Sequence, residues 1–176
     1  MKEIKRKSIK QVEVEEILYI ASDGKEFKRE DECKDHERTL LVQEATRSLR
    51  LKTGNTNDIL GFNTNLRYFI FTYRIDKDDL CKETLNILGR SYIRQDKDNN
   101  ISTVSRLNID PSSVDALGDL IEKYKFKDRE QYLFIMEDTY YSQEYDDYTF
   151  SYHIDAKSEI ENKVGIFLKQ LLEKFE

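Results

Sequence analysis

Residues 67–75, with the sequence RYFIFTYRI, form the strongest β-strand pattern in the chain. Aromatic and β-branched side chains are enriched in strands, and here they run with almost no polar interruption. A strand with one solvated face alternates between polar and apolar residues, whereas a strand buried on both faces is apolar nearly throughout. We therefore expect residues 67–75 to form a central strand of a sheet that is covered on both faces.

Other segments carry weaker strand patterns. Residues 12–20 end at an Asp-Gly turn, a pair that tolerates positive φ. Residues 92–94 and 101–104 flank a polar stretch and predict a hairpin. A second hairpin is predicted from residues 132–136 and 148–154, with its turn at residues 142–144. Its second strand alternates apolar and polar side chains, and the apolar positions are Tyr148, Phe150, Tyr152 and Ile154.

Apolar residues at helical spacing alternate with these strands along the chain. They predict four helices: residues 29–50, a helix opened by Asp76 or Asp78 and ended near Gly89, a helix opened by Asp110-Pro111, and a helix from Asp155 or Ser158 to the C-terminal end. Strands and helices are mixed without a regular βαβ period, so we expect an α+β fold: a mixed, largely antiparallel sheet with flanking helices.

The Gly- and Asn-rich residues 53–57 predict a linker. We accordingly divide the chain into an N-terminal strand-turn-helix module, residues 1–52, and an α+β main domain, residues 66–176.

The composition points to a protein of the cytoplasm. No apolar run approaches the roughly 20 residues needed to span a bilayer, so we expect no membrane contact. The basic N-terminus is not followed by the apolar stretch of a signal peptide. Cys33 and Cys81 lie far apart without framework spacing, which is typical of reduced cytosolic thiols.

No catalytic or cofactor signature is present in the sequence. The glycines do not form a phosphate-binding loop, so we expect no nucleotide cofactor. Asp35-His36-Glu37 lies close to Cys33, but adjacent helical residues point in different directions and cannot form one site. Cys33-x-x-His36 has the spacing of half a zinc site, and no second pair completes it. We therefore predict no catalytic residues and no metal site, and an enzyme is the less favoured class.

The segment from residue 137 to residue 161 is strongly acidic in a chain whose formal net charge is −6. Its first part combines carboxylates with tyrosines, which are favoured at interfaces because they add rigid, amphipathic contact area. Such a surface fits a basic groove on a partner. The predicted partner-binding residues are Glu137, Asp138, Tyr140, Tyr141, Glu144, Tyr145, Asp146 and Asp147. The alternative is an ordinary charged hairpin turn, which stays equally open for Tyr140, Tyr141 and Tyr145. For Tyr148, Phe150, Tyr152 and Ile154 we favour the core face of one strand.

Two other modes of nucleic-acid chemistry stay open. Glu137 and Asp138 follow a predicted strand, and clustered carboxylates can hold Mg²⁺ in a nuclease that acts on RNA or DNA. The first ten residues are basic and could contact nucleic acid directly, through Lys2, Lys5, Arg6, Lys7 and Lys10.

Residues 19–27, YIASDGKEF, and residues 32–37, ECKDHE, carry a resemblance to a recurring N-terminal module, Y-x-A-x-DG-x-EF…EC-x-x-HE. It resembles the opening of small phage and prophage proteins of low-GC Gram-positive bacteria, and covers about residues 14–45. Proteins of that kind include inhibitors of type II CRISPR nucleases. The resemblance implies an anti-defence protein in the bacterial host cell, whose partner is a host nuclease effector or its guide-RNA complex.

Overall fold

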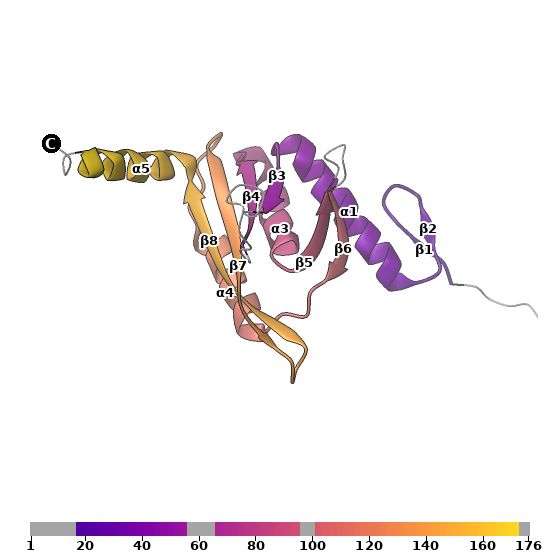
Figure 1. Ribbon diagram of the computed structural model, residues 1–176. Helices are drawn as coiled ribbons and strands as arrows, with labels where there is room; N and C mark the ends of the chain where they lie inside the picture. Colours follow the sequence, from indigo (N-terminus) through magenta and orange to yellow (C-terminus); the bar gives the residue numbers. More distant parts are fainter. Residues whose placement is uncertain (1–16, 56–65, 96–100, 173–176) are drawn as a thin grey trace, which may run out of the picture.

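The fold is α+β, with helices packed against one face of an antiparallel sheet (Figure 1). The computed structural model describes residues 17–55, 66–95 and 101–172. The main sheet has the strand order β3-β4-β7-β8. Its strands are β3 (Lys52–Asn55), β4 (Leu66–Thr72), β7 (Gln131–Ser142) and β8 (Asp147–Ala156). Two small hairpins complete the strands: β1 (Tyr19–Ile20) with β2 (Glu26–Phe27), and β5 (Ser91–Gln95) with β6 (Ile101–Arg106).

Three helices cover the sheet: α1 (Glu30–Ser48), α3 (Asp78–Leu88) and α4 (Pro111–Lys123). A short 3-10 helix, η1 (Ile75–Lys77), precedes α3. All three helices contribute to one hydrophobic core, and their fully buried side chains include Val42 and Ala45 of α1, Leu85 and Leu88 of α3, and Leu117 and Ile121 of α4. The fourth helix, α5 (Lys157–Leu172), extends away from the body of the molecule (Figure 1).

The core is organised around an aromatic stack that crosses three strands. Phe69 of β4 lies directly opposite Phe134 of β7, and their ring centroids are 5.8 Å apart. Phe134 also stacks on Tyr152 of β8 at 6.0 Å. The Tyr152 hydroxyl donates a 3.0 Å hydrogen bond to the carbonyl of Gly89, where α3 ends, and burial raises the pKa of Tyr152 to about 12. The stack therefore joins the sheet to the helical layer.

Gly89 is required where α3 meets α4. A Cβ atom at this position would lie 2.5 Å from the Cδ2 atom of Leu117, closer than side-chain atoms approach one another. A side chain at this residue would therefore displace the buried Leu117 where the end of α3 meets α4. The glycine at which the sequence predicts the end of the helix thus has a packing role as well.

The prediction for β4 is confirmed for its place in the sheet and wrong for its burial. β4 is an inner strand, but only the side that carries Phe69 and Phe71 is fully buried. Tyr68 and Ile70 on the opposite side are half-buried, because no helix among the described residues covers that face. The strand also ends at Thr72, before η1, rather than at residue 75.

Other predicted elements differ in their limits. Residues 53–55, predicted as a linker, belong to β3 and pair with β4. Of the strand predicted over residues 12–20, the structure shows only β1, and residues 12–16 lie outside the described part. The boundary between the two predicted units falls mainly on residues 56–65, which are also outside it, and stays a prediction. However, Val42 and Ala45 place the second half of α1 in the main core.

Helix α5 begins at Lys157, directly after β8, so neither Asp155 nor Ser158 caps it from outside. The hydroxyl of Ser158 instead bonds to the carboxylate of Glu130. Val164 and Phe167 of its apolar side are exposed, Phe167 to 61%. No helix of the described residues is long and apolar enough to cross a membrane.

The position of Phe134 in the aromatic stack predicts how much stability is lost when its side chain is truncated. Phe134→Ala removes a side chain that is 0% exposed and contacts rings on both neighbouring strands, so we expect a loss of about 3–5 kcal/mol in the free energy of unfolding. The measurement is urea denaturation followed by circular dichroism. Leu133→Ala is the matched control, because Leu133 lies on the half-buried face of the same strand. Equal losses in the two variants would contradict this account of the core.

Candidate functional site

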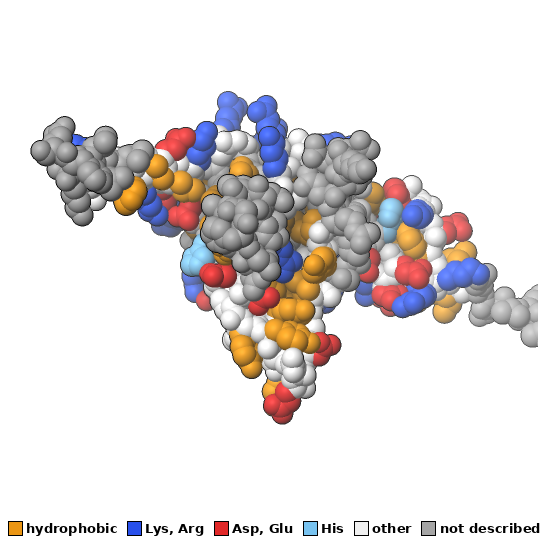
Figure 2. Space-filling view, viewed as in Figure 1, with side chains coloured by type: hydrophobic (Ala, Val, Ile, Leu, Met, Phe, Trp, Pro, Cys, Tyr) orange, Lys and Arg blue, Asp and Glu red, His pale blue; other side chains and the backbone are white. Residues whose placement is uncertain are grey.

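The predicted partner-binding residues lie on the outer part of the β7–β8 hairpin. β7 pairs with β4 only as far as Glu137, which lies opposite Leu66. Beyond this rung, residues 138–150 form a two-stranded extension that projects from the body of the molecule (Figure 1). We call this extension the hairpin arm. Figure 2 shows a band of hydrophobic side chains along it and acidic side chains at its tip.

A β-bulge in the arm changes which side chains share a face. The pairing shifts between Asp138, which lies opposite Phe150, and Tyr140, which lies opposite Thr149. Thr139 is the extra residue, and its hydroxyl donates a 2.9 Å hydrogen bond to the carbonyl of Thr149. A bulge reverses the alternation of side chains beyond it. With continuous alternation Tyr140 would share a face with Phe134 and Met136. The bulge instead places Tyr141 on that face, and Tyr140 lies on the opposite one.

One face of the arm continues the aromatic core outward. Tyr141 lies opposite Tyr148 with ring centroids 4.7 Å apart, and Tyr148 stacks on Phe150 at 5.9 Å. Phe150, Tyr152 and Ile154 are buried and Tyr148 is half-buried, so the prediction that this alternating set faces the core is confirmed. Tyr140 and Tyr145 differ from them, because they are 64% and 69% exposed.

The carboxylates of the predicted site are dispersed along the arm. Glu137 and Asp138 are neighbours on one strand and therefore point to opposite faces of the sheet. Glu137 accepts a 3.4 Å hydrogen bond from the Ser151 hydroxyl, and burial raises the pKa of Asp138. The remaining three lie at the tip: Glu144, Asp146 and Asp147.

The tip carboxylates form no ion pair within the described part of the chain, whereas the charge of Arg67 acts on Asp138. No described lysine or arginine forms an ion pair with Glu137, Glu144 or the three aspartates of the site. Asp146 accepts a 2.7 Å hydrogen bond from the Tyr141 hydroxyl, which also raises the pKa of Tyr141. The later part of the acidic segment differs, because Asp155 pairs with Lys163 and Glu161 with Lys157. Among the described residues, the tip carboxylates Glu144, Asp146 and Asp147 thus carry charge that no ion pair compensates.

A neighbouring segment holds the arm in place. The backbone of Tyr148 exchanges hydrogen bonds with Asn108 and Asp110, and the buried Ser113 hydroxyl accepts from the Phe150 amide at 3.1 Å. The side-chain amide of Asn108 donates a 2.7 Å bond to the carbonyl of Asp146 at the tip. These bonds occupy the outer edge of β8, so the arm is anchored along one side.

Arg67 lies at the base of the arm and was not among the predicted site residues. Its guanidinium lies 5.6 Å from the ring centroid of Tyr92 and 5.4 Å from that of Phe150. Burial lowers the pKa of Arg67, while the charge of Asp138 opposes this shift. A signal was present in the sequence: Arg67 has the same strand parity as Phe69 and Phe71, which places a cation on the core face.

The geometry does not bring a metal site together. Glu137 and Asp138 face apart, so the two cannot act as ligands of one ion on the strand that carries them. In residues 17–55, 66–95 and 101–172, no three His, Cys, Asp or Glu side chains are grouped as metal ligands. Cys33 and Cys81 are both buried, and burial raises the pKa of the Cys81 thiol to about 12.

The motif residues of the N-terminal segment contact one another. His36 Nε2 lies 2.8 Å from the carboxylate of Asp23, in the turn between β1 and β2. Glu37 accepts hydrogen bonds from the amide and the hydroxyl of Ser22, and the ring of His36 lies 5.1 Å from that of Phe27. Helix α1 therefore holds the hairpin through the DG and HE residues of the motif.

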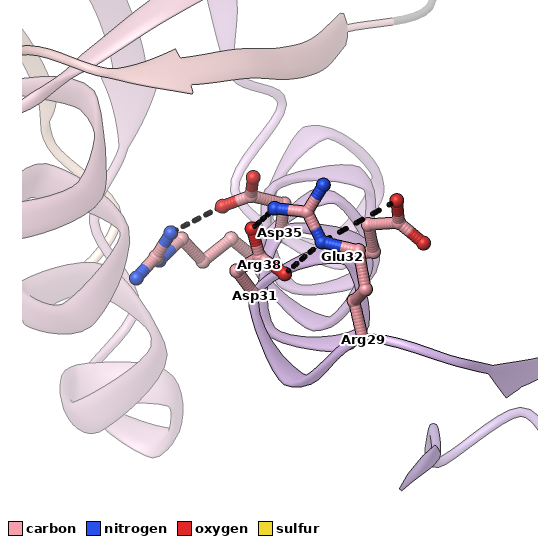
Figure 3. A network of polar contacts seen from close by, with 5 residues as sticks. All are labelled: Arg29, Asp31, Glu32, Asp35 and Arg38. Carbon is pink, nitrogen blue, oxygen red and sulfur yellow. Dashed lines mark hydrogen bonds and ion pairs between the residues drawn. The ribbon is translucent and has the colours of Figure 1, made fainter. Parts of the chain in front are cut away.

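Asp35 takes no part in this contact. Figure 3 shows it paired with Arg38, while Arg29 bonds to Asp31 and Glu32 at the start of the helix. Asp35, His36 and Glu37 thus have three different partners, as expected for adjacent helical residues.

The basic residues predicted to contact nucleic acid, Lys2, Lys5, Arg6, Lys7 and Lys10, lie outside the described residues. Comparisons of the chain with protein-family models, with curated proteins and with solved structures found no match.

The contact between Asp23 and His36 predicts a local acid transition. The hydrogen bond to His36 is the largest cause that lowers the pKa of Asp23 below 3.8. A carboxyl with a lowered pKa stabilises the fold above its unfolded-state pKa, and this contribution is lost as the pH falls through the folded-state value. We expect the β1–β2 turn to detach from α1 below about pH 3.8, as followed by the NMR signals of Lys25 and His36. In Asp23→Asn this transition should be absent, and a titration midpoint above 3.8 would contradict the assignment.

Proposed function

We propose that this chain is a binding protein that docks its hairpin arm on a positively charged surface of another macromolecule. The observation that carries the proposal is the group of three tip carboxylates, Glu144, Asp146 and Asp147, none of which forms an ion pair with a described lysine or arginine. Charged groups without an internal partner attract a complementary surface and raise the rate of encounter. At the tip, Glu144, Asp146 and Asp147 would meet the cations of the partner.

The exposed tyrosines would supply the contact area. Tyr140 and Tyr145 each present an aromatic ring and a hydroxyl to solvent, and tyrosine is enriched among the residues that dominate binding energy. The arm is anchored by Asn108 and Ser113, so little conformational entropy would be lost on docking. A rigid, acidic, tyrosine-bearing arm is suited to enter a basic groove.

We further propose that the partner is a host nucleic-acid-handling enzyme, namely an RNA-guided nuclease of the type II CRISPR class, and that the chain inhibits it. Such an enzyme holds its guide and target strands in a positively charged channel. The arm would compete with nucleic acid for that channel. The resemblance of residues 19–37 to modules of phage and prophage proteins supports this choice of partner and an anti-defence role in the bacterial cytoplasm.

The test is binding to a purified type II effector, with and without guide RNA, measured by biolayer interferometry alongside inhibition of DNA cleavage. Glu144→Lys with Asp147→Lys reverses two tip charges, and we expect affinity to fall by about tenfold or more. Asp115→Lys with Glu122→Lys is the matched control, because both residues are exposed on α4 and the net charge changes equally.

Three outcomes would count against the proposal. Absence of binding to the effector, both with and without guide RNA, would overturn the choice of partner. Equal losses in the two double variants would overturn the arm as the docking surface. Cleavage of guide RNA or DNA by the chain alone with Mg²⁺, abolished by EDTA and by Glu137→Ala, would identify a nuclease instead.

A further inference from the structure

Two adjoining cavities on the helical side of the molecule share the same two arginines. One, of about 380 Å³, lies beside the segment that leads from β6 into α4. The other, of about 260 Å³, lies between α1, α3 and the β5–β6 hairpin. Arg90 and Arg106 line both cavities, and Arg38 of α1 lines the second. We call this combined feature the arginine groove.

The arginine groove carries an excess of positive charge in an acidic chain. Glu83 is the one carboxylate among its lining residues. Arg38 pairs with Asp35 on its own helix, and Figure 3 shows its side chain directed away from Arg29 and the start of α1. Neither Arg90 nor Arg106 forms an ion pair with any described residue. Like charges that share a cavity repel one another, and a bound anion would relieve this repulsion.

The fold fixes the backbone of Arg90 but does not use all the hydrogen-bond donors of its guanidinium group. Its backbone amide donates to Ile87, and its carbonyl accepts a 2.9 Å bond from Leu107, so its backbone is fixed between α3 and β6. Its Nε atom is buried without a hydrogen-bond partner in the described structure. Its Nη2 atom reaches only Asn86 Oδ1, at 3.5 Å. Buried donors of this kind are normally satisfied by protein, by water or by a bound anion, so Arg90 has donor capacity that the described residues do not use.

The chemistry of the lining selects the class of ligand. The planar guanidinium fork matches the oxygens of a phosphate group and can bind two of them at once. Asn86 and Asn108 add neutral polar groups to the walls. Together the two cavities offer room for more than a single phosphate. We propose that the arginine groove binds the phosphate groups of a nucleotide or of a nucleic-acid strand.

This site is separate from the docking surface of the arm, and binding there would not depend on the arm carboxylates. Asn108 nevertheless connects the two, because it lines the groove and its side chain bonds to the carbonyl of Asp146. An acidic arm and a basic groove thus lie next to each other. In a complex of a basic protein with nucleic acid, the protein would offer positive charge to the arm and the nucleic acid would offer negative charge to the groove.

The experiment measures binding of three probes to the full chain: inorganic phosphate, ATP and a fluorescently labelled single-stranded RNA 12-mer. Isothermal titration calorimetry serves for the first two and fluorescence anisotropy for the third, each at low and at physiological salt. Arg106→Gln should lower the affinity for the bound probe by about tenfold or more, because it removes one charged donor from both cavities. Arg47→Gln, exposed in the last turn of α1 and not part of the groove, should leave binding unchanged.

Arg90→Lys retains the charge but removes the guanidinium fork, and we expect a similar loss with an unchanged thermal midpoint. If that variant fails to fold, Arg106→Gln still decides, because Arg106 is exposed. Saturable binding of ATP would identify a nucleotide site, and binding of RNA alone would identify a strand site. Binding of none of the probes, or equal weakening by Arg106→Gln and Arg47→Gln, would overturn the proposal. The arm variant Glu144→Lys with Asp147→Lys should not weaken phosphate binding.

Discussion

The stacking of Phe69, Phe134 and Tyr152 across β4, β7 and β8 is the contact on which the rest of the structure depends. It fixes the register of the three strands, because a shift of one residue would turn every buried ring to the half-buried face. Since β7 and β8 are longer than β4, the same register carries both strands past the last rung of the sheet at Glu137. The hairpin arm is therefore a continuation of the core rather than a loop added to it.

Two local devices then determine what the arm presents. The bulge at Thr139 reverses the alternation of β7, so Tyr141 joins the aromatic face while Tyr140 is exposed. Asn108, in the segment before α4, and Ser113, in the first turn of α4, bond to the outer edge of β8 and to the tip. An unpaired strand edge invites pairing with other chains, and this segment occupies it where the arm leaves the body. The β8 edge of the arm is therefore closed to pairing with another strand.

The spacing of hydrophobic residues along the sequence was sufficient to predict the α+β class, the inner position of β4 and the core face of β8. This spacing did not predict features that depend on contacts between residues far apart in the sequence. The Gly54 and Asn55 pair resembles a linker, yet Gly54 lies in β3, where a Cβ would meet the hydroxyl of Tyr68 at 2.3 Å. The bulge leaves no mark in a single sequence. The sequence did not predict the arginine groove, because Arg38, Arg90 and Arg106 come from α1, from the turn before β5 and from β6.

The N-terminal motif shows why a conspicuous pattern need not mark chemistry. Its Asp-Gly turn and its His-Glu pair lie more than ten residues apart, and that spacing lets the first turns of α1 reach back to the hairpin. Three residues of the motif that could serve as a base, His36, Glu37 and Asp23, are engaged in this contact. The motif therefore builds a small hairpin-and-helix unit, and α1 connects it to the core through Val42 and Ala45. The binding proposals therefore rest on two other surfaces, the hairpin arm and the arginine groove.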